Sequence, residues 1–178
     1  MRELESLPWD DPYQRRCFQV LLAEYHFQEA QIRDLTQQLH ELAADERYRG
    51  RVALLRTVPR MGRLTAIELL LELQDVGRFR RAAQLGAYVG LTPAQYSSGE
   101  HVRLGRITGQ GKPMLRMLLV QLAWRVIGAD GALRQRYEAL RGRAGGKRAI
   151  VAIARLLLLR IRHMLLADEP YVVGLVSG

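Results

Sequence analysis

Cysteine, lysine and long apolar segments are all scarce in this sequence. Cys17 is the single cysteine among 178 residues, which excludes a disulfide framework and a thiolate metal cluster and fits a reducing compartment. No segment reaches the roughly 18 uncharged apolar residues that a membrane-spanning helix needs. The first residues are acidic and lack the apolar region of a signal peptide. We therefore expect a cytoplasmic protein that does not contact a membrane.

Positive charge, carried almost entirely by arginine, is what the sequence has in excess. The formal net charge is +9 and the isoelectric point is about 10.4, yet Lys112 and Lys147 are the only lysines. Arginine presents a rigid fork of hydrogen-bond donors that matches phosphate, so this composition favours a nucleic-acid partner. The alternative is a GC-rich genome whose codons favour arginine.

Apolar residues recur every three or four positions between residues 18 and 42, which is the spacing of a coiled-coil seam. Asp11-Pro12 predicts the start of this helix, with the acid at the cap and the proline in the first turn. We expect residues 1–48 to form a helical arm that self-associates into a homo-oligomer. The alternative is an amphipathic helix packed on its own domain. The seam consists of Phe18, Leu21, Tyr25, Gln28, Ile32, Leu35, Leu39 and Leu42.

A helix, a short turn and a second helix are predicted over residues 51–73. Thr65–Glu68 has the pattern of a capping box on the second helix. The arrangement is typical of a helix-hairpin-helix, whose turn amides and second helix face a DNA phosphate. Glycine is usual in such a turn where this chain has arginine at position 60, and a purely structural helical hairpin is the alternative. The candidate DNA-binding residues of this turn are Arg60, Gly62 and Arg63.

The longest stretch without a helical pattern runs from residue 90 to residue 116 and is rich in glycine and proline. Long irregular connections in compact domains are usually functional, so the site is sought here. Within this irregular loop we expect only a small two-stranded ribbon around Gly105, formed by residues 101–104 and 106–107. Four basic residues accompany the loop and are candidate phosphate contacts, with solvated charges as the alternative. They are Arg103, Arg106, Lys112 and Arg116.

Helices are predicted on both sides of the loop, which makes the fold class all-α. Residues 79–91 form one helix, and a long apolar helix begins at Pro113 and ends at Asp130-Gly131. Residues 133–140 form a short helix, and residues 147–166 form the last core helix. We expect residues 49–170 to form one domain and residues 171–178 an apolar tail.

Several motifs in this order resemble the carboxy-terminal domain of the DEDD insertion-sequence transposases, the family of bridge-RNA-guided recombinases and related invertases. The resemblance covers about residues 10 to 166. It rests on Leu55–Gly62 with Thr65-Ala66, on Arg78-Phe79, on Leu85–Pro93, on Ser98-Gly99 and on Leu115-Arg116.

A serine nucleophile is what this resemblance implies for the glycine-rich loop. The family's proposed nucleophile maps onto Ser98, and Ser97 is the reserve candidate. A hydroxyl needs activation to attack a phosphate, and His101 is the nearest candidate base. Without the resemblance, a serine beside a glycine would indicate only a turn.

Relatives in this family carry an amino-terminal RuvC-like domain whose four acids hold magnesium. We expect this chain to lack that domain, to bind no metal of its own and to be inactive alone, although it belongs to an enzyme. Mg²⁺ is then expected only through the RuvC-like domain. DNA is the expected partner, and the resemblance leaves a guide RNA open as a second one.

The function that follows is the DNA-binding and strand-exchange portion of an insertion-sequence transposase, in which Ser98 attacks a DNA phosphate. The alternative is a non-enzymatic, dimerising helix-hairpin-helix module that binds DNA and is a transposase remnant. A third interpretation, a structural interaction protein built on the arm, predicts no DNA affinity.

Overall fold

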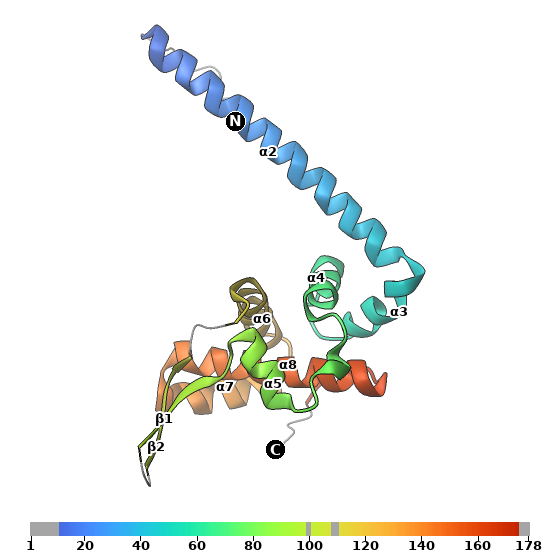
Figure 1. Ribbon diagram of the computed structural model, residues 1–178, viewed down its shortest axis with the longest axis vertical. Coiled ribbons are helices and arrows are strands. Elements are labelled where there is room, and N and C mark those ends of the chain that lie inside the picture. The colour runs from blue at the N-terminus through green and yellow to red at the C-terminus, as the bar shows by residue number, and fades with distance from the viewer. Residues whose placement is uncertain (1–10, 99–100, 108–110, 175–178) are drawn as a thin grey trace. The chain divides into compact units, whose positions relative to one another are not determined.

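The computed structural model describes residues 11–98, 101–107 and 111–174, and it describes side chains for residues 11–92 and 111–174 (Figure 1). The chain divides into two compact units, residues 1–41 and 42–178. Each unit is described by itself below.

The first unit is built on one continuous helix, α2 (Pro12–Ala44). The Asp11 carboxylate accepts a hydrogen bond from the Tyr13 amide at 2.9 Å, so the predicted acid-and-proline start is confirmed. Several seam side chains are exposed, Ile32 and Leu35 among them at 63% and 55%. The helix therefore presents an apolar stripe on its surface.

The second unit consists of helices, a short 3₁₀ turn and one pair of strands, and its class is all-α as predicted. The helices are α3 (Glu46–Leu55), α4 (Arg63–Leu73), α5 (Ala82–Val89), α6 (Pro113–Val126), α7 (Gly131–Ala144) and α8 (Gly146–Ala167), and the turn is η1 (Val76–Arg78). The strands are β1 (Pro93–Ser98) and β2 (His101–Ile107), which pair antiparallel.

Helix α8 is the centre of the core. It contacts α3, α5, α6, α7 and η1, and it lies across the second unit in Figure 1. Its apolar residues recur at helical spacing, and Ile153, Leu157 and Ile161 are completely buried. Each buried side chain of this size contributes about 1.5–3 kcal/mol relative to its exposed state. The predicted last core helix is thus confirmed as the element that holds the others in place.

Two predicted helix boundaries are wrong because polar side chains turn the chain. The helix predicted over 79–91 begins only at Ala82, where the Gln84 side chain accepts a hydrogen bond from the Arg81 amide at 3.1 Å, and it ends at Val89. Asp130 does not end the long apolar helix, which ends at Val126. It caps α7 by accepting from two amides of that helix's first turn.

A buried polar network fixes the start of the tail to the helical core. The Tyr171 hydroxyl donates to Oδ2 of Asp130 at 2.7 Å and accepts from the Arg160 guanidinium at 2.6 Å. Burial raises the pKa of Tyr171, and its hydrogen bond to Asp130 raises it further. The Tyr171 amide donates to the Thr57 hydroxyl at 2.8 Å. One tail residue thus joins α7, α8 and the turn after α3.

Candidate nucleic-acid interface

The turn between α3 and α4 carries the predicted DNA-binding residues Arg60, Gly62 and Arg63. Val58 and Met61 are buried under the turn, and the Met61 amide donates to the Val58 carbonyl at 3.1 Å. Arg60 and Arg63 are exposed. Packing from below therefore fixes the turn, while its two arginines remain accessible.

Arg60 has the backbone conformation of a glycine, with φ of 64°. A non-glycine residue in this left-handed region costs about 1–2 kcal/mol. The turn thus holds a cationic residue in a conformation that glycine would adopt without steric cost. The strain is offset by the buried residues on either side.

The second helix of the hairpin begins earlier than predicted, and the capping box at Thr65–Glu68 is wrong. Helix α4 starts at Arg63 with Gly62 as its N-cap, and no side chain caps it. Glycine has no oxygen to offer to the first-turn amides. Unpaired amides at a helix start carry partial positive charge, which suits an anion such as phosphate.

The serine-bearing segment is more regular than predicted. Instead of an irregular loop, residues 93–98 form strand β1, and residues 101–107 form one continuous strand β2. The register pairs Ser97 with Val102 and Ser98 with His101. The prediction that the ribbon turns at Gly105 is wrong, because Gly105 lies inside β2. An irregularity in the pairing between Pro93 and Gln95 accommodates one extra residue of β2 near that glycine. In Figure 1 the ribbon extends from the helices of this unit.

The backbone of the ribbon brings the candidate nucleophile and the candidate base opposite one another. Ser98 ends β1 and His101 begins β2, and they are Cα partners. The side chains of Ser97, Ser98, Arg103 and Arg106 lie outside the described residues. The structure therefore places these four positions on one ribbon and gives no contacts for them.

The two ends of the ribbon segment are joined by a backbone contact between glycines. Gly90 ends α5 with φ of 77°, and Gly111 has φ of 104°. A Cβ atom on Gly111 would lie 2.7 Å from both the Gly90 nitrogen and the Tyr88 carbonyl oxygen. The next amide, that of Lys112, donates to the same carbonyl at 3.1 Å. Glycine is required here because the two chain segments leave no space for a side chain.

Lys112 stands at the ribbon base but already has a partner. Its Nζ lies 2.6 Å from Oε2 of Glu72 and 5.4 Å from the centre of the Tyr88 ring. The hydrogen bond that Lys112 donates to the Glu72 carboxylate raises the pKa of Lys112, and its interaction with Tyr88 raises it further. The side chain is therefore a cation at neutral pH, and a phosphate would have to compete with Glu72 for it.

Arg116 lies one helical turn further along α6 and is only partly exposed. Its Nη1 atom is buried and has no hydrogen-bond partner. An unpaired buried donor costs free energy.

These geometries agree with the similarity of the chain to known proteins. Residues 52–138 match the sequence model of the Transposase IS116/IS110/IS902 family. Over these residues the chain is similar to a domain of this transposase family. The matched segment runs from α3 into α7, and it includes the hairpin turn, the ribbon and the start of α6.

Individual transposases align over a large part of the chain. The transposase for insertion sequence element IS1111A of Coxiella burnetii is 31% identical over 173 residues, which is 92% of this chain and 45% of that relative. The transposase for insertion sequence element IS1328 of Yersinia enterocolitica is 35% identical over 63% of this chain and 33% of its own length. A probable family 20 transposase of Pseudomonas aeruginosa is 34% identical over 56% of this chain and 28% of its own length. The chain spans less than half the length of these curated relatives.

Lys112 belongs to a cluster beside the ribbon base whose other members were assigned no role from the sequence. The Arg78 guanidinium lies over the rings of Phe79 and Tyr88, at 4.6 and 4.8 Å. Burial alone would raise the pKa of Tyr88, but Lys112 and Arg78 beside it bring that pKa below its ordinary value. Glu72 and Lys112 lie 40 positions apart, so no local spacing could have indicated this pairing.

Neither a metal site nor a membrane span is found in the described part of the transposase-like chain. Among residues 11–98, 101–107 and 111–174, no group of three or more His, Cys, Asp or Glu side chains could hold a metal ion. The described acids therefore do not fit a magnesium centre. In the same residues, no helix has both the length and the hydropathy to cross a membrane.

Proposed function

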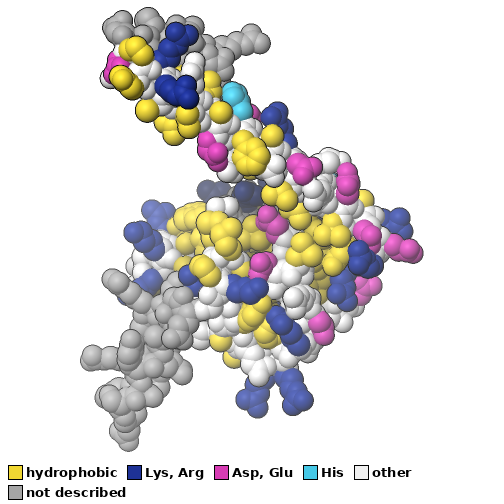
Figure 2. Space-filling model, turned by 45° about the horizontal axis from the view of Figure 1, so that its top comes forward, with side chains coloured by type: hydrophobic (Ala, Val, Ile, Leu, Met, Phe, Trp, Pro, Cys, Tyr) yellow, Lys and Arg dark blue, Asp and Glu magenta, His cyan; other side chains and the backbone are white. Residues whose placement is uncertain are grey.

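We propose that this chain is the DNA-binding and strand-exchange portion of an insertion-sequence transposase. The observation that carries the proposal is the family match over residues 52–138, which contains the hairpin and the ribbon together. Basic side chains lie at several places on the face of the second unit that Figure 2 shows, with apolar groups between them. The net charge of +9 supports attraction to a polyanion.

The proposed chemistry is a transesterification at Ser98. The serine oxygen attacks a DNA phosphorus atom, a bond from serine oxygen to phosphorus forms, and the bond from phosphorus to one strand oxygen breaks. The serine proton passes to a base, for which His101 is the candidate, and the departing strand oxygen takes up a proton. One phosphodiester replaces another, so the strand can be rejoined without an energy source.

Covalent capture of DNA tests this chemistry. Ser98→Ala, in a complex of this chain with the RuvC-like half of a transposase, is expected to abolish DNA–protein adducts and leave DNA binding intact, because the substitution removes a single hydroxyl. Ser97→Ala is the matched control and should retain the adduct. Mass spectrometry of the adduct identifies the serine, and undiminished adducts in Ser98→Ala would eliminate the mechanism.

DNA binding itself is tested by its salt dependence. Affinity for a duplex should fall steeply as salt rises, because arginines that neutralise phosphates release counterions. Arg60→Glu and Arg63→Glu should both weaken binding if the hairpin turn faces DNA. Fluorescence anisotropy measures both effects, and an excess of unlabelled RNA shows whether a guide RNA competes for the same surface.

The second candidate, a dimerising module without catalysis, is favoured by the exposed stripe on α2. A heptad seam hides its apolar residues by supercoiling with a second copy. Replacing Ile32 and Leu35 with aspartate should then give monomers in sedimentation experiments. A native chain that stays monomeric at tens of micromolar would contradict self-association.

A further inference from the structure

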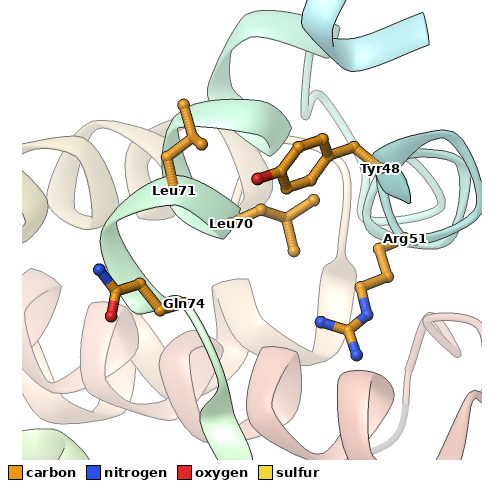
Figure 3. Close-up of a pocket in the computed structure, with 5 residues that line it drawn as sticks. All are labelled: Tyr48, Arg51, Leu70, Leu71 and Gln74. Carbon is orange, nitrogen blue, oxygen red and sulfur yellow. The ribbon is translucent and has the colours of Figure 1, made fainter. Parts of the chain in front are cut away.

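A small pocket lies between the first part of α3 and the end of α4, away from the turn that joins the two helices. Its volume is about 290 Å³, and its lining comes from two elements. Tyr48 and Arg51 lie on α3, and Leu70, Leu71 and Gln74 lie at the end of α4, as Figure 3 shows. Ligand pockets in proteins are typically about 300–1,000 Å³, so this one suits a single small group.

The lining combines an apolar wall with polar groups that make no hydrogen bond within the described residues. In Figure 3 the Tyr48 ring reaches toward α4 close to Leu70 and Leu71. Neither the Tyr48 hydroxyl nor the side-chain amide of Gln74 has a hydrogen-bond partner among the residues that the structure describes. A glutamine side chain offers both a donor and an acceptor, which is what the edge of a nucleobase requires.

Arg51 adds a positive charge at the pocket, and it has no acidic partner within the described part of the chain. The neighbouring Arg47 is different, because its Nε lies 2.9 Å from Oδ1 of Asp45. An unpaired guanidinium beside an apolar wall matches the two halves of a nucleotide, a phosphate and a flat base.

Gln74 keeps its side chain at a backbone position that favours glycine. Its φ is 55°, and its backbone N–H donates to the Leu70 carbonyl at 2.8 Å at the end of α4. Glycine would adopt this conformation without steric cost. The strained Gln74 lies at the pocket lining, and such strain is typical of binding sites.

We propose that this pocket binds one unpaired base of the bound nucleic acid, stacked on Tyr48 and read by Gln74, with its phosphate on Arg51. The inference rests on the proposed function, because it assumes a nucleic-acid partner. It adds a subsite for an unstacked nucleotide, separate from the hairpin turn and the ribbon.

A bulged duplex is the probe. Two duplexes of the same sequence are compared, one perfectly paired and one with a single extra base that is a fluorescent aminopurine. The native chain should prefer the bulged duplex by about tenfold, which is the scale of one stacked base. Stacking on Tyr48 should also quench the aminopurine.

Three variants locate the preference in the pocket. Tyr48→Leu removes the ring and keeps the wall apolar, and Gln74→Gly removes the amide while relieving the backbone strain, so it is not expected to unfold the chain. Arg51→Gln removes the charge, and Arg49→Gln, on the same helix but outside the pocket lining, is its matched control. The first three should reduce the preference for the bulge, and the control should keep it.

The outcomes separate this inference from the proposed function. Equal affinity of the native chain for both duplexes overturns the pocket assignment and leaves DNA binding in place. A bulge preference that survives both Tyr48→Leu and Gln74→Gly also overturns it and leaves the pocket to a protein side chain. Absence of binding to either duplex at low salt overturns the proposed function together with the inference.

Discussion

The hairpin turn and the ribbon base, the two places where DNA contacts are expected, are held by different physical means. The turn is fixed by side chains: Val58 and Met61 are buried beneath it, and Thr57 accepts a hydrogen bond from the tail. The ribbon base is fixed by the backbone, because Gly90 and Gly111 pack without side chains between them. A turn held by side chains tolerates a strained residue such as Arg60, whereas a backbone contact tolerates no added atom.

The largest loss of stability is expected where side chains hold the tail beside the hairpin turn. Asp130→Ala removes the buried carboxylate that binds Tyr171 and caps α7, and it leaves the nearly buried Arg160 without its anion. Breaking such a buried pair costs about 3–5 kcal/mol. Urea denaturation measures the loss. Asp75→Ala, which removes an exposed cap by the same substitution, should cost only about 1 kcal/mol or less.

The next largest loss of stability is expected at the backbone contact of the ribbon base. Gly111→Ala places a Cβ 2.7 Å from two backbone atoms at a φ of 104°, so the free energy of unfolding should fall by about 2 kcal/mol or more. Thermal melting followed by circular dichroism measures this. Gly142→Ala in α7 is the control, because its Cβ would meet nothing within 4 Å, and it should raise stability by about 0.5–1 kcal/mol. Equal melting of the two variants would contradict the close contact of Gly90 and Gly111.

A smaller effect sharpens the comparison at the hairpin turn. Arg60→Gly relieves the left-handed strain, and the net gain in stability should be about 0.5 kcal/mol once the greater freedom of glycine in the unfolded chain is counted. The same variant should weaken DNA binding by removing a charge. Arg60→Ala removes the same charge and keeps the strain, so a difference in stability between the two variants isolates the backbone term. No such difference would mean that the turn is not strained.

The smallest effect is a dependence on acid. Burial would raise the pKa of Asp130, but the Tyr171 hydroxyl and the amides of Leu133, Gly174 and Ala132 outweigh it, and the pKa lies below its ordinary value. A lowered carboxyl pKa stabilises the fold above the unfolded value of about 3.9, and the contribution is lost as pH falls through the folded pKa. Native protein should therefore lose more stability than Asp130→Asn between about pH 5 and about pH 2. Parallel losses would exclude this role for the carboxylate.

Local pattern was enough to predict the helices, because each depends on neighbours in the sequence. Apolar spacing predicted α8, and proline predicted the starts of α2 and α6. The contacts that join distant segments were not predictable from spacing. Tyr171 and Asp130 are 41 positions apart, and the tail was predicted to be merely apolar.

In the candidate site, too, local features were predictable and contacts between distant residues were not. Arg60 and Gly62 were assigned to the hairpin turn from the sequence, and the structure places both there. The ribbon was mispredicted because strand pairing depends on register with a partner strand, which glycine and proline content does not specify. The pocket was missed because Tyr48 and Gln74 come from different helices and meet only after those helices pack.

The glycine contact at the ribbon base also bears on how this family diversifies. Because residues 90 and 111 touch through their backbones, the intervening segment begins and ends at one point of the helical scaffold. Insertions, deletions or whole replacements in such a segment leave the scaffold's geometry unchanged, since long surface loops cost little extra closure entropy. The ribbon can therefore be replaced as one unit. Chimeras that carry the corresponding ribbon of a related protein between the two glycines provide a direct route to assigning its chemistry.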